Sequence, residues 1–262
     1  MDGNFLAEEA TVEFAGRTVA IAGAAGGIGS TVARAFAEEG AELVVLDLEE
    51  RRLDTLANKL RATGASVHVA PVDVRDALAV DEVASSLAPG PVDVLVNAVG
   101  ILRQYEIVDM DPADFDDLVA VNVRGVYLLI RAFVPMMPEG SAIVNFGSVA
   151  GYVGSEGGWS YTMTKGAVSS MTFGLAQELA PRGIRVNAIC PGWVDAGFTH
   201  SMVVDETTRQ QVETAATQAH VLGRMARPEE IAQGVLYLAS QRRASFVTGT
   251  NHFVDGGFMI KR

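Results

Sequence analysis

Tyr161 and Lys165 are the residues of this sequence whose types and spacing best suit chemistry. They stand four positions apart, and residues i and i+4 share one face of an α-helix. An ammonium beside a phenol favours the phenolate, so we expect the pKa of Tyr161 to fall below its reference value of about 10. A tyrosine tuned in this way can act as a general acid or base. Ser148, upstream of the pair, has a hydroxyl that could orient the reacting oxygen.

Taken alone, the spacing of Tyr161 and Lys165 is only weak support for a catalytic role. The sequence has five tyrosines and three lysines, Lys59, Lys165 and Lys261, so a chance Tyr–Lys pair at this spacing is roughly a one-in-twenty event. A tyrosine packed beside a solvated lysine is the alternative interpretation. The choice between these two interpretations therefore depends on the elements that would position the pair.

A glycine-rich turn lies between an apolar strand at 18–22 and a helical pattern at 30–39. Gly23, Gly27 and Gly29 follow the spacing G-x-x-x-G-x-G. A strand, a glycine turn and a helix bring backbone N–H groups and a helix N-terminus to a diphosphate. An ordinary strand-to-helix turn is the alternative.

Asp47 ends the next expected strand, 42–46, and follows Gly29 by 18 residues. A carboxylate near this position binds both hydroxyls of an adenosine ribose and repels a 2′-phosphate, which predicts NAD rather than NADP. A role as the N-cap of a helix over 48–62 is the alternative. The neighbouring Arg51 and Arg52 would weaken the discrimination.

Strand and helix patterns alternate along the chain. Further strands are expected at 66–72, 91–96, 142–146, 184–189 and 247–254, and further helices at 75–87, 112–137, 160–179, about 206–219 and 231–239. This order predicts an α/β fold: one Rossmann-type domain over 1–262, with a doubly wound parallel sheet of about seven strands flanked by helices. Asn122 and Gly125 should kink the long apolar helix or admit a water. Residues 194–223 are expected to form a substrate lid.

Composition narrows the classes of function. The net charge is −12, which argues against a nucleic-acid or anionic-membrane surface. The longest apolar runs are far shorter than a membrane span, so we expect a soluble protein. The acidic N-terminus does not resemble a signal peptide. A single cysteine, Cys190, excludes an intrachain disulfide and predicts a cytoplasmic protein. The four scattered histidines show no ligand spacing, so no metal is expected.

Several motifs in order resemble the short-chain dehydrogenase/reductase family over nearly the whole chain. These motifs are Gly23/Gly27/Gly29, Asp73-Val74, Asn97-Ala98-Val99-Gly100, Asn122, Ser148, Tyr161, Lys165, Pro191-Gly192 and Val254-Asp255-Gly256-Gly257. The resemblance implies an NAD(P)-dependent oxidoreductase acting on CH–OH donors, commonly a homotetramer. It also implies a catalytic set matching Asn122, Ser148, Tyr161 and Lys165.

By this resemblance Tyr161 exchanges a proton with the substrate oxygen while hydride passes between the substrate carbon and nicotinamide C4. Lys165 would hold the nicotinamide ribose and lower the tyrosine pKa, Ser148 would bond the substrate oxygen, and Asn122 would hold a water that links Lys165 to solvent. The remaining NAD contacts that the resemblance implies are Ile28, Leu48, Asp73, Val74, Asn97, Ala98, Gly100, Pro191, Gly192 and Val194.

Two positions depart from the family pattern. Ala22 stands where a threonine usually precedes the first glycine, and Ala196 replaces the threonine that helps to fix the nicotinamide carboxamide. Thr199 or the backbone must compensate for the second. Neither change touches the proton-transfer residues.

The substrate is expected to be a small alcohol or ketone. Trp159, Trp193, Phe198 and Met202 would give a largely apolar pocket. Arg103 could meet an anionic group, although a solvated arginine is the alternative.

Competing functions remain open from the sequence. They are an NADP-using ketone reductase, a redox isomerase or dehydratase, and a non-catalytic nucleotide sensor on the same fold. An isomerase or dehydratase is less expected because the chain lacks an added substrate domain. The presence of Ser148, Tyr161 and Lys165 together argues against a non-catalytic sensor. A serine hydrolase is disfavoured because Ser148 is not within a G-x-S-x-G elbow.

Overall fold

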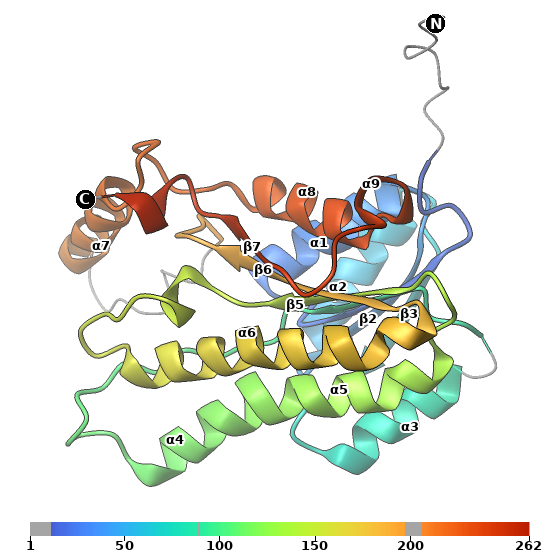
Figure 1. Cartoon of the computed structure of the whole chain (residues 1–262), viewed down its shortest axis with the longest axis horizontal. Helices are drawn as coiled ribbons and strands as arrows, with labels where there is room; N and C mark the ends of the chain where they lie inside the picture. Colours follow the sequence, from blue (N-terminus) through green and yellow to red (C-terminus); the bar gives the residue numbers. More distant parts are fainter. Residues whose placement is uncertain (1–11, 88–89, 197–205, 262) are drawn as a thin grey trace, which may run out of the picture.

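Seven parallel strands form one sheet, in the order β3-β2-β1-β4-β5-β6-β7 (Figure 1). The computed structural model describes residues 12–87, 90–196 and 206–261. The strands are β1 Thr18–Ala22, β2 Glu42–Asp47, β3 Val67–Pro71, β4 Val94–Asn97, β5 Ala142–Phe146, β6 Arg185–Pro191 and β7 Asn251–Val254. The chain winds outward in both directions from the junction between β1 and β4, which confirms the predicted doubly wound Rossmann-type fold.

Two helical layers cover the sheet (Figure 1). One layer holds α1 Gly27–Glu38, α2 Glu50–Arg61 and α8 Pro228–Ala239; the other holds α3 Ala77–Leu87, α4 Pro112–Val119, α5 Val126–Phe133 and α6 Trp159–Leu179. The remaining helices are α7 Glu206–Gln218 and the short α9 Gln241–Ala244.

The central strands are apolar on both faces because both are covered. In β1, Val19 and Ile21 join the core under α1 and α8, while Ala20 and Ala22 join the core under α5 and α6. Such continuous apolar runs are typical of parallel strands buried between helices. Alternation along one strand therefore supplies both cores of the single sheet.

The helix that begins at Pro112 contains a π-helical segment, Ala120–Gly125, between α4 and α5. Asp111 caps its start, because the carboxylate accepts from Ala113 N at 2.8 Å. The expected irregularity at Asn122 and Gly125 is thus a wider turn. A Cβ on Gly125 would lie 2.7 Å from Val74 Cγ2, so the helix passes too close to that residue for a side chain. π-Bulges are often found at functional sites.

By length and composition the helical run Pro112–Met136 could cross a membrane, because an 18-residue window within it has a mean hydropathy of 1.5. The sequence expectation of shorter apolar runs does not hold for it. A core helix passes the same test, and the inward side of α5, including Leu129 and Phe133, is fully buried against the sheet.

Two boundaries differ from the prediction in an informative way. Helix α1 begins at Gly27, three residues earlier than expected, so two motif glycines lie inside its first turn. Strand β7 covers only Asn251–Val254, because the preceding Thr248 and Gly249 bond to β6 from a turn.

Candidate active site

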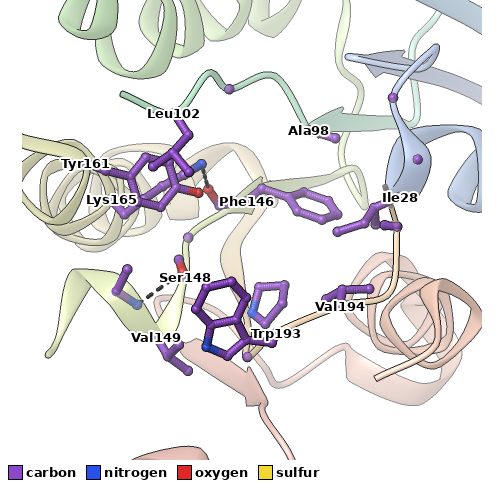
Figure 2. A pocket seen from close by; sticks show the side chains of 18 of the residues that line it. Ile28, Ala98, Leu102, Phe146, Ser148, Val149, Tyr161, Lys165, Trp193 and Val194 are labelled. Atoms are coloured by element: carbon purple, nitrogen blue, oxygen red, sulfur yellow. Dashed lines mark hydrogen bonds between the residues drawn. The ribbon is translucent and has the colours of Figure 1, made fainter. Parts of the chain in front are cut away.

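A cavity of 480 Å³ opens where the carboxyl ends of β1, β4, β5 and β6 meet (Figure 2). Its walls come from the loop after each of these strands and from the first turns of α6. Parallel strands place all these loops at one edge of the sheet, and the point where the strand order reverses is the usual ligand site of this fold. The topology therefore gathers motifs that are more than 160 residues apart in sequence.

The motif glycines are required by close backbone approaches. A Cβ on Gly23, which has φ 80°, would lie 2.7 Å from the Ala98 carbonyl, and one on Gly29 would lie 2.1 Å from Gly23 O. A Cβ on Gly27 would lie 2.0 Å from Ala196 O. All three glycines line the cavity. The turn is thus a backbone cradle that ends in the uncapped N-terminus of α1, which suits a diphosphate.

Ser148, Tyr161 and Lys165 line the same cavity at its other end (Figure 2). Ser148 follows β5 and caps the 3-10 turn Val149–Gly151, its Oγ accepting from Ala150 N at 3.1 Å. The hydroxyl hydrogen remains able to donate into the cavity. Helix α6 brings Tyr161 and Lys165 to one face, with the lysine Nζ 5.6 Å from the centroid of the phenol ring.

The electrostatics of the pair differ from the sequence expectation. Burial raises the pKa of Tyr161 above its ordinary value, whereas the sequence argument expected a lowered pKa. Burial also lowers the pKa of Lys165 to about 8. The reason is that burial penalises both charged forms, and the ammonium donates to Phe146 O at 2.8 Å instead of bonding the phenol oxygen.

Asn122 lies behind the cavity and holds the loop after β4. It is fully buried in the π-helical segment, and its amide bonds both backbone groups of Ile101 as well as Thr164 Oγ1. A Cβ on Gly100 would lie 3.4 Å from Lys165 Nζ and 3.6 Å from Asn122 Oδ1. Gly100 thus leaves room for the lysine and the asparagine to approach the same point of the loop.

Asp47 stands at the carboxyl end of β2. Its Oδ2 accepts from Ala25 N at 3.0 Å and its Oδ1 from Leu48 N at 2.8 Å, so the carboxylate braces the glycine turn. The N-cap of α2 is Glu49, without a side-chain cap bond, so Asp47 does not cap that helix. Arg52 from the first turn of α2 lines the cavity, 3.6 Å from Glu49 in an exposed ion pair.

Of the residues expected to bind the cofactor, the structure brings most but not all to the cavity wall. Ile28, Ala98, Gly100, Pro191, Gly192 and Val194 line it together with the motif glycines. Asp47, Leu48, Asp73, Val74 and Asn97 are not among its lining residues in the described chain. Leu48 is 62% exposed, and the Asn97 amide donates to Asn145 Oδ1 at 2.9 Å inside the sheet.

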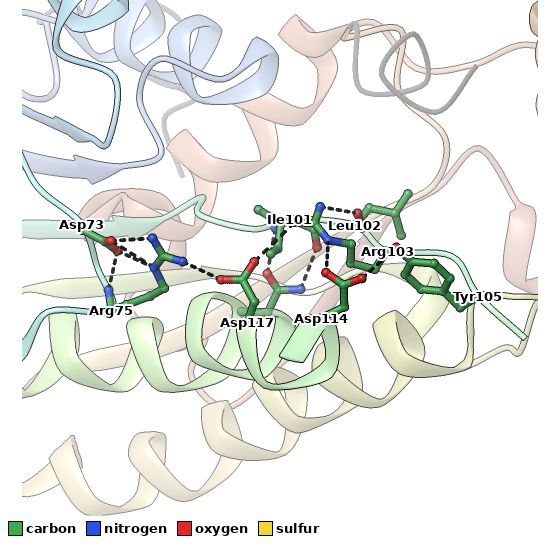
Figure 3. A network of polar contacts seen from close by, with 9 residues as sticks. Asp73, Arg75, Ile101, Leu102, Arg103, Tyr105, Asp114 and Asp117 are labelled. Carbon is green, nitrogen blue, oxygen red and sulfur yellow. Dashed lines mark hydrogen bonds and ion pairs between the residues drawn. The ribbon is translucent and has the colours of Figure 1, made fainter. Parts of the chain in front are cut away.

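Asp73 and Arg103 belong to one network of ion pairs along α4 (Figure 3). Arg75 contacts Asp73 at 2.7 Å and Asp117 at 2.6 Å. Its hydrogen bond to the Asp73 carboxylate holds the pKa of Asp73 below its usual range. Arg103 pairs with Asp117 at 3.4 Å and with Asp114 at 3.6 Å. The network thus draws Arg103 toward α4 and away from an anionic substrate group.

The expected substrate residues divide accordingly. Trp193 lines the cavity, whereas Arg103 and Trp159 are not among the lining residues described. Trp159 stacks on Phe115 of α4, with ring centroids 6.1 Å apart. Phe198, Thr199 and Met202 lie outside the described residues, as does the whole stretch 197–205 of the expected lid.

Several cavity residues were missed by the sequence argument. They are Leu102 and Gln104 after β4, Val149, Val153 and Ser155 after β5, and Phe258 near the C-terminus. The first five directly follow motifs already recognised, so their positions were available signals. Phe258 had no such signal, because it reaches the cavity only through the turn after β7.

The residues present fit a nicotinamide dinucleotide. The glycine cradle and the free N-terminus of α1 suit its diphosphate, and the cavity continues from there to Tyr161 and Lys165. Among the described residues, no group of three or more His, Cys, Asp or Glu could hold a metal ion.

Comparison with known proteins gives the family. A family model described as enoyl-(acyl carrier protein) reductase matches residues 23–259. Galactitol 2-dehydrogenase (L-tagatose-forming) of Cereibacter sphaeroides is 40% identical over 252 residues, covering 94% of this chain and 96% of the relative. The 3-oxoacyl-[acyl-carrier-protein] reductase of Thermotoga maritima is 37% identical over 249 residues, covering 94% and 98%.

A solved structure of a short-chain dehydrogenase/reductase (glucose/ribitol dehydrogenase) from Brucella melitensis is similar throughout. Its TM-score is 0.88 at 33% identity, with 95% of this chain and 99% of that chain covered. The family model's match runs from the glycine turn past the final strand. The chain therefore belongs to the short-chain dehydrogenase/reductase family and is an NAD(P)-dependent oxidoreductase.

Proposed function

We propose that this protein transfers hydride between NAD and a secondary alcohol or ketone, with Tyr161 as the general acid and base. The observation that supports this most is that Ser148, Tyr161 and Lys165 line one cavity together with the three motif glycines. When bound, the nicotinamide accepts or supplies the hydride, and the protein supplies position and charge.

Each catalytic side chain has a distinct part in this scheme. As the tyrosinate, Tyr161 takes the hydroxyl proton of an alcohol; as the phenol, it gives a proton to a ketone oxygen. Ser148 donates its free hydroxyl hydrogen to the same oxygen and so orients it. Lys165 holds the cofactor ribose, and its ammonium favours the tyrosinate once the phenol must ionise. Asn122 holds the loop after β4, which faces these three side chains. We also propose that Asn122 holds a water that links Lys165 to solvent.

A preference for NAD over NADP is the finer part of the proposal. The Asp47 carboxylate, fixed against Ala25 N, leaves a negative charge at the end of β2, where it would repel a 2′-phosphate. Arg52 in the cavity wall favours the alternative, an NADP-using ketone reductase, and a relative named as a 3-oxoacyl reductase shares 37% identity. Because the Asp47 carboxylate bonds the glycine turn directly, we favour NAD.

The substrate that suits the cavity is neutral and partly apolar. Leu102, Val149, Val153, Trp193 and Phe258 give it an apolar wall, and Gln104 and Ser155 add neutral polar groups. The charged residues in the described lining are Arg52 and Lys165, and the cofactor would take both. Because carboxylates hold Arg103, a neutral secondary alcohol suits this wall better than an anionic alcohol does.

The direct test is turnover by the wild-type protein with NAD and with NADP across a panel of neutral and anionic secondary alcohols. NAD-dependent oxidation that favours the neutral alcohols would support the proposal. Tight binding of NAD without turnover on any alcohol or on the matching ketones would instead favour a nucleotide sensor.

We also propose that the protein is a homotetramer in the cytoplasm. Helix α6 carries the small residues Ala167, Ser170 and Gly174, of which Ser170 and Gly174 are exposed, and small residues would allow another helix to approach. The single cysteine, Cys190, is buried and free, in keeping with a reducing compartment. Fractionation of cells that express the chain at native level would test its location; recovery from a periplasmic or membrane fraction would contradict it.

A further inference from the structure

His220 is a buried imidazole just after α7 that the proposed chemistry does not use. It is 1% exposed, and both of its ring nitrogens have partners. Nδ1 lies 2.7 Å from Ala216 O, and Nε2 lies 3.1 Å from Trp193 N. A backbone carbonyl only accepts and a backbone N–H only donates, so Nδ1 must bear the hydrogen and Nε2 must accept. The two contacts select one neutral tautomer.

The chain around His220 is shaped to this ring. A Cβ on Gly192 would lie 2.5 Å from Nε2, and one on Gly256 would lie 3.3 Å from Cδ2. The ring of Phe258 packs at a tilt, 5.7 Å between centroids. Two glycines thus leave the space that the imidazole fills, and its aromatic neighbour reaches the cavity wall.

The bond from Trp193 to His220 has a counterpart on the other side of the same residue. Trp193 O accepts from Ala226 N at 2.9 Å, so both backbone groups of Trp193 are fixed. The indole lines the cavity together with Ser148 and Val149 (Figure 2). The placement of this indole therefore depends on a bond that the imidazole makes.

The charged groups near His220 bond to backbone groups and not to its ring nitrogens. Lys261 Nζ donates to His220 O at 2.9 Å and to Gln218 O. The Asp255 carboxylate accepts from Gly257 N and Met259 N at 3.0 and 2.9 Å. The imidazole thus meets backbone groups through its nitrogens.

We propose that His220 is a positioning residue for the substrate side of the cavity. As the Nδ1–H tautomer it fixes the Trp193 backbone, and with it the indole, against the end of α7. Its effect on substrate rests on the proposed function, because Trp193 lines the cavity in which the substrate would bind. The tautomer and the surroundings of Trp193 can be measured without any turnover.

A matched pair of variants separates the two bonds. The His220→Asn amide can reach Ala216 O but not Trp193 N, whereas the His220→Gln oxygen can reach Trp193 N. We expect His220→Asn to raise KM for the alcohol about three- to tenfold, the effect of one lost hydrogen bond, with kcat changed less. His220→Gln should restore a KM close to that of the wild type. Equal KM values in the two variants would overturn the proposal.

Tryptophan fluorescence tests the same point without substrate. In a Trp159→Phe background, Trp193 is the remaining tryptophan. His220→Asn should make its emission more accessible to a neutral quencher such as acrylamide, and His220→Gln should not. Unchanged quenching in His220→Asn would contradict the positioning role. This result stands even if the wild type oxidises no alcohol, in which case only the proposed function fails.

The tautomer can be read in the wild type, whose fold no substitution disturbs. Two-bond ¹H–¹⁵N correlation of protein with ¹⁵N-labelled histidine distinguishes the Nδ1–H, Nε2–H and doubly protonated rings. The signal that disappears in His220→Gln belongs to His220. At neutral pH it should have the Nδ1–H pattern; an Nε2–H or doubly protonated ring would overturn the inference.

Discussion

Asn122 holds Ile101 by both of its backbone polar groups: the amide Oδ1 accepts from Ile101 N at 2.8 Å, and Nδ2 donates to Ile101 O at 2.9 Å. Nδ2 also lies 3.1 Å from Thr164 Oγ1, one residue before Lys165. One buried amide therefore joins the loop after β4 to the helix of the proposed catalytic pair. The π-helical segment places Asn122 where it can reach both.

Asn122→Ala should weaken both the fold and the activity. It leaves the two Ile101 groups without their partner, and an unsatisfied buried group costs about 1–3 kcal/mol. Denaturant unfolding gives the loss of stability, and steady-state rates give the loss of kcat. Asn187 is a matched control, since its amide also bonds two backbone groups, Val247 O and Thr250 N, inside the sheet. Asn187→Ala should lose similar stability but retain more of its kcat once folded; equal losses of kcat would contradict a role for Asn122 at the site.

Asp47→Asn is the variant that isolates the charge from the brace. The amide oxygen can still accept from Ala25 N, but the negative charge that opposes a 2′-phosphate is gone. The preference for NAD over NADP should shrink by about tenfold or more, which corresponds to about 1.4 kcal/mol. Dissociation constants for both cofactors measure this, with Asp54→Asn on the exposed side of α2 as the control for net charge. A wild type that prefers NADP would contradict the assignment.

Lys165 should make stability rise with pH. Its pKa in the folded protein is about 8, below the reference value of 10.5, so between these values the unfolded chain binds more protons. Stability increases with pH wherever the unfolded state binds more protons. Relative to Lys165→Met, the wild-type free energy of unfolding should therefore rise by about 2 kcal/mol from pH 8 to pH 10.

The difference between the two unfolding curves removes the titrations that both proteins share. Tyr161 and Cys190, whose pKa values burial raises, act in the opposite direction at higher pH and are present in both. A flat difference between pH 8 and pH 10 would show that Lys165 is solvated in the folded chain.

Assembly can be tested through Gly174 on the outer side of α6. Nothing lies within 4 Å of a Cβ built there, so the single chain should accept a side chain. In a tetramer packed through this face, Gly174→Lys should shift the assembly to smaller species without loss of chain stability. Light scattering measures this, and a wild type that is monomeric at micromolar concentration would refute the homotetramer.

Much of the fold was predictable because its signals are local. The alternation of apolar strands and helical patterns predicted the doubly wound parallel sheet, and the order of motifs placed Ser148, Tyr161 and Lys165 together. Side-chain direction was not local. Trp159 and Arg103 point to α4 because Phe115, Asp114 and Asp117 lie there, and no pattern in their own segments indicates this.

The predicted lowering of the Tyr161 pKa was wrong for a related reason. Four-residue spacing predicts that a phenol and an ammonium share a helix face, but burial and the Phe146 carbonyl depend on β5, which is distant in sequence. The sequence did not predict the role of His220 for the same reason, because its bond to Trp193 joins residues 27 positions apart.

Tyr161→Phe tests the central claim most directly. The substitution keeps the ring and its packing but removes the one group proposed to exchange a proton with the substrate. Cofactor affinity, measured separately by titration, should stay close to that of the wild type, while kcat falls by at least about 100- to 10,000-fold, the usual contribution of a general acid or base. Near-wild-type turnover in Tyr161→Phe would contradict the account of this site.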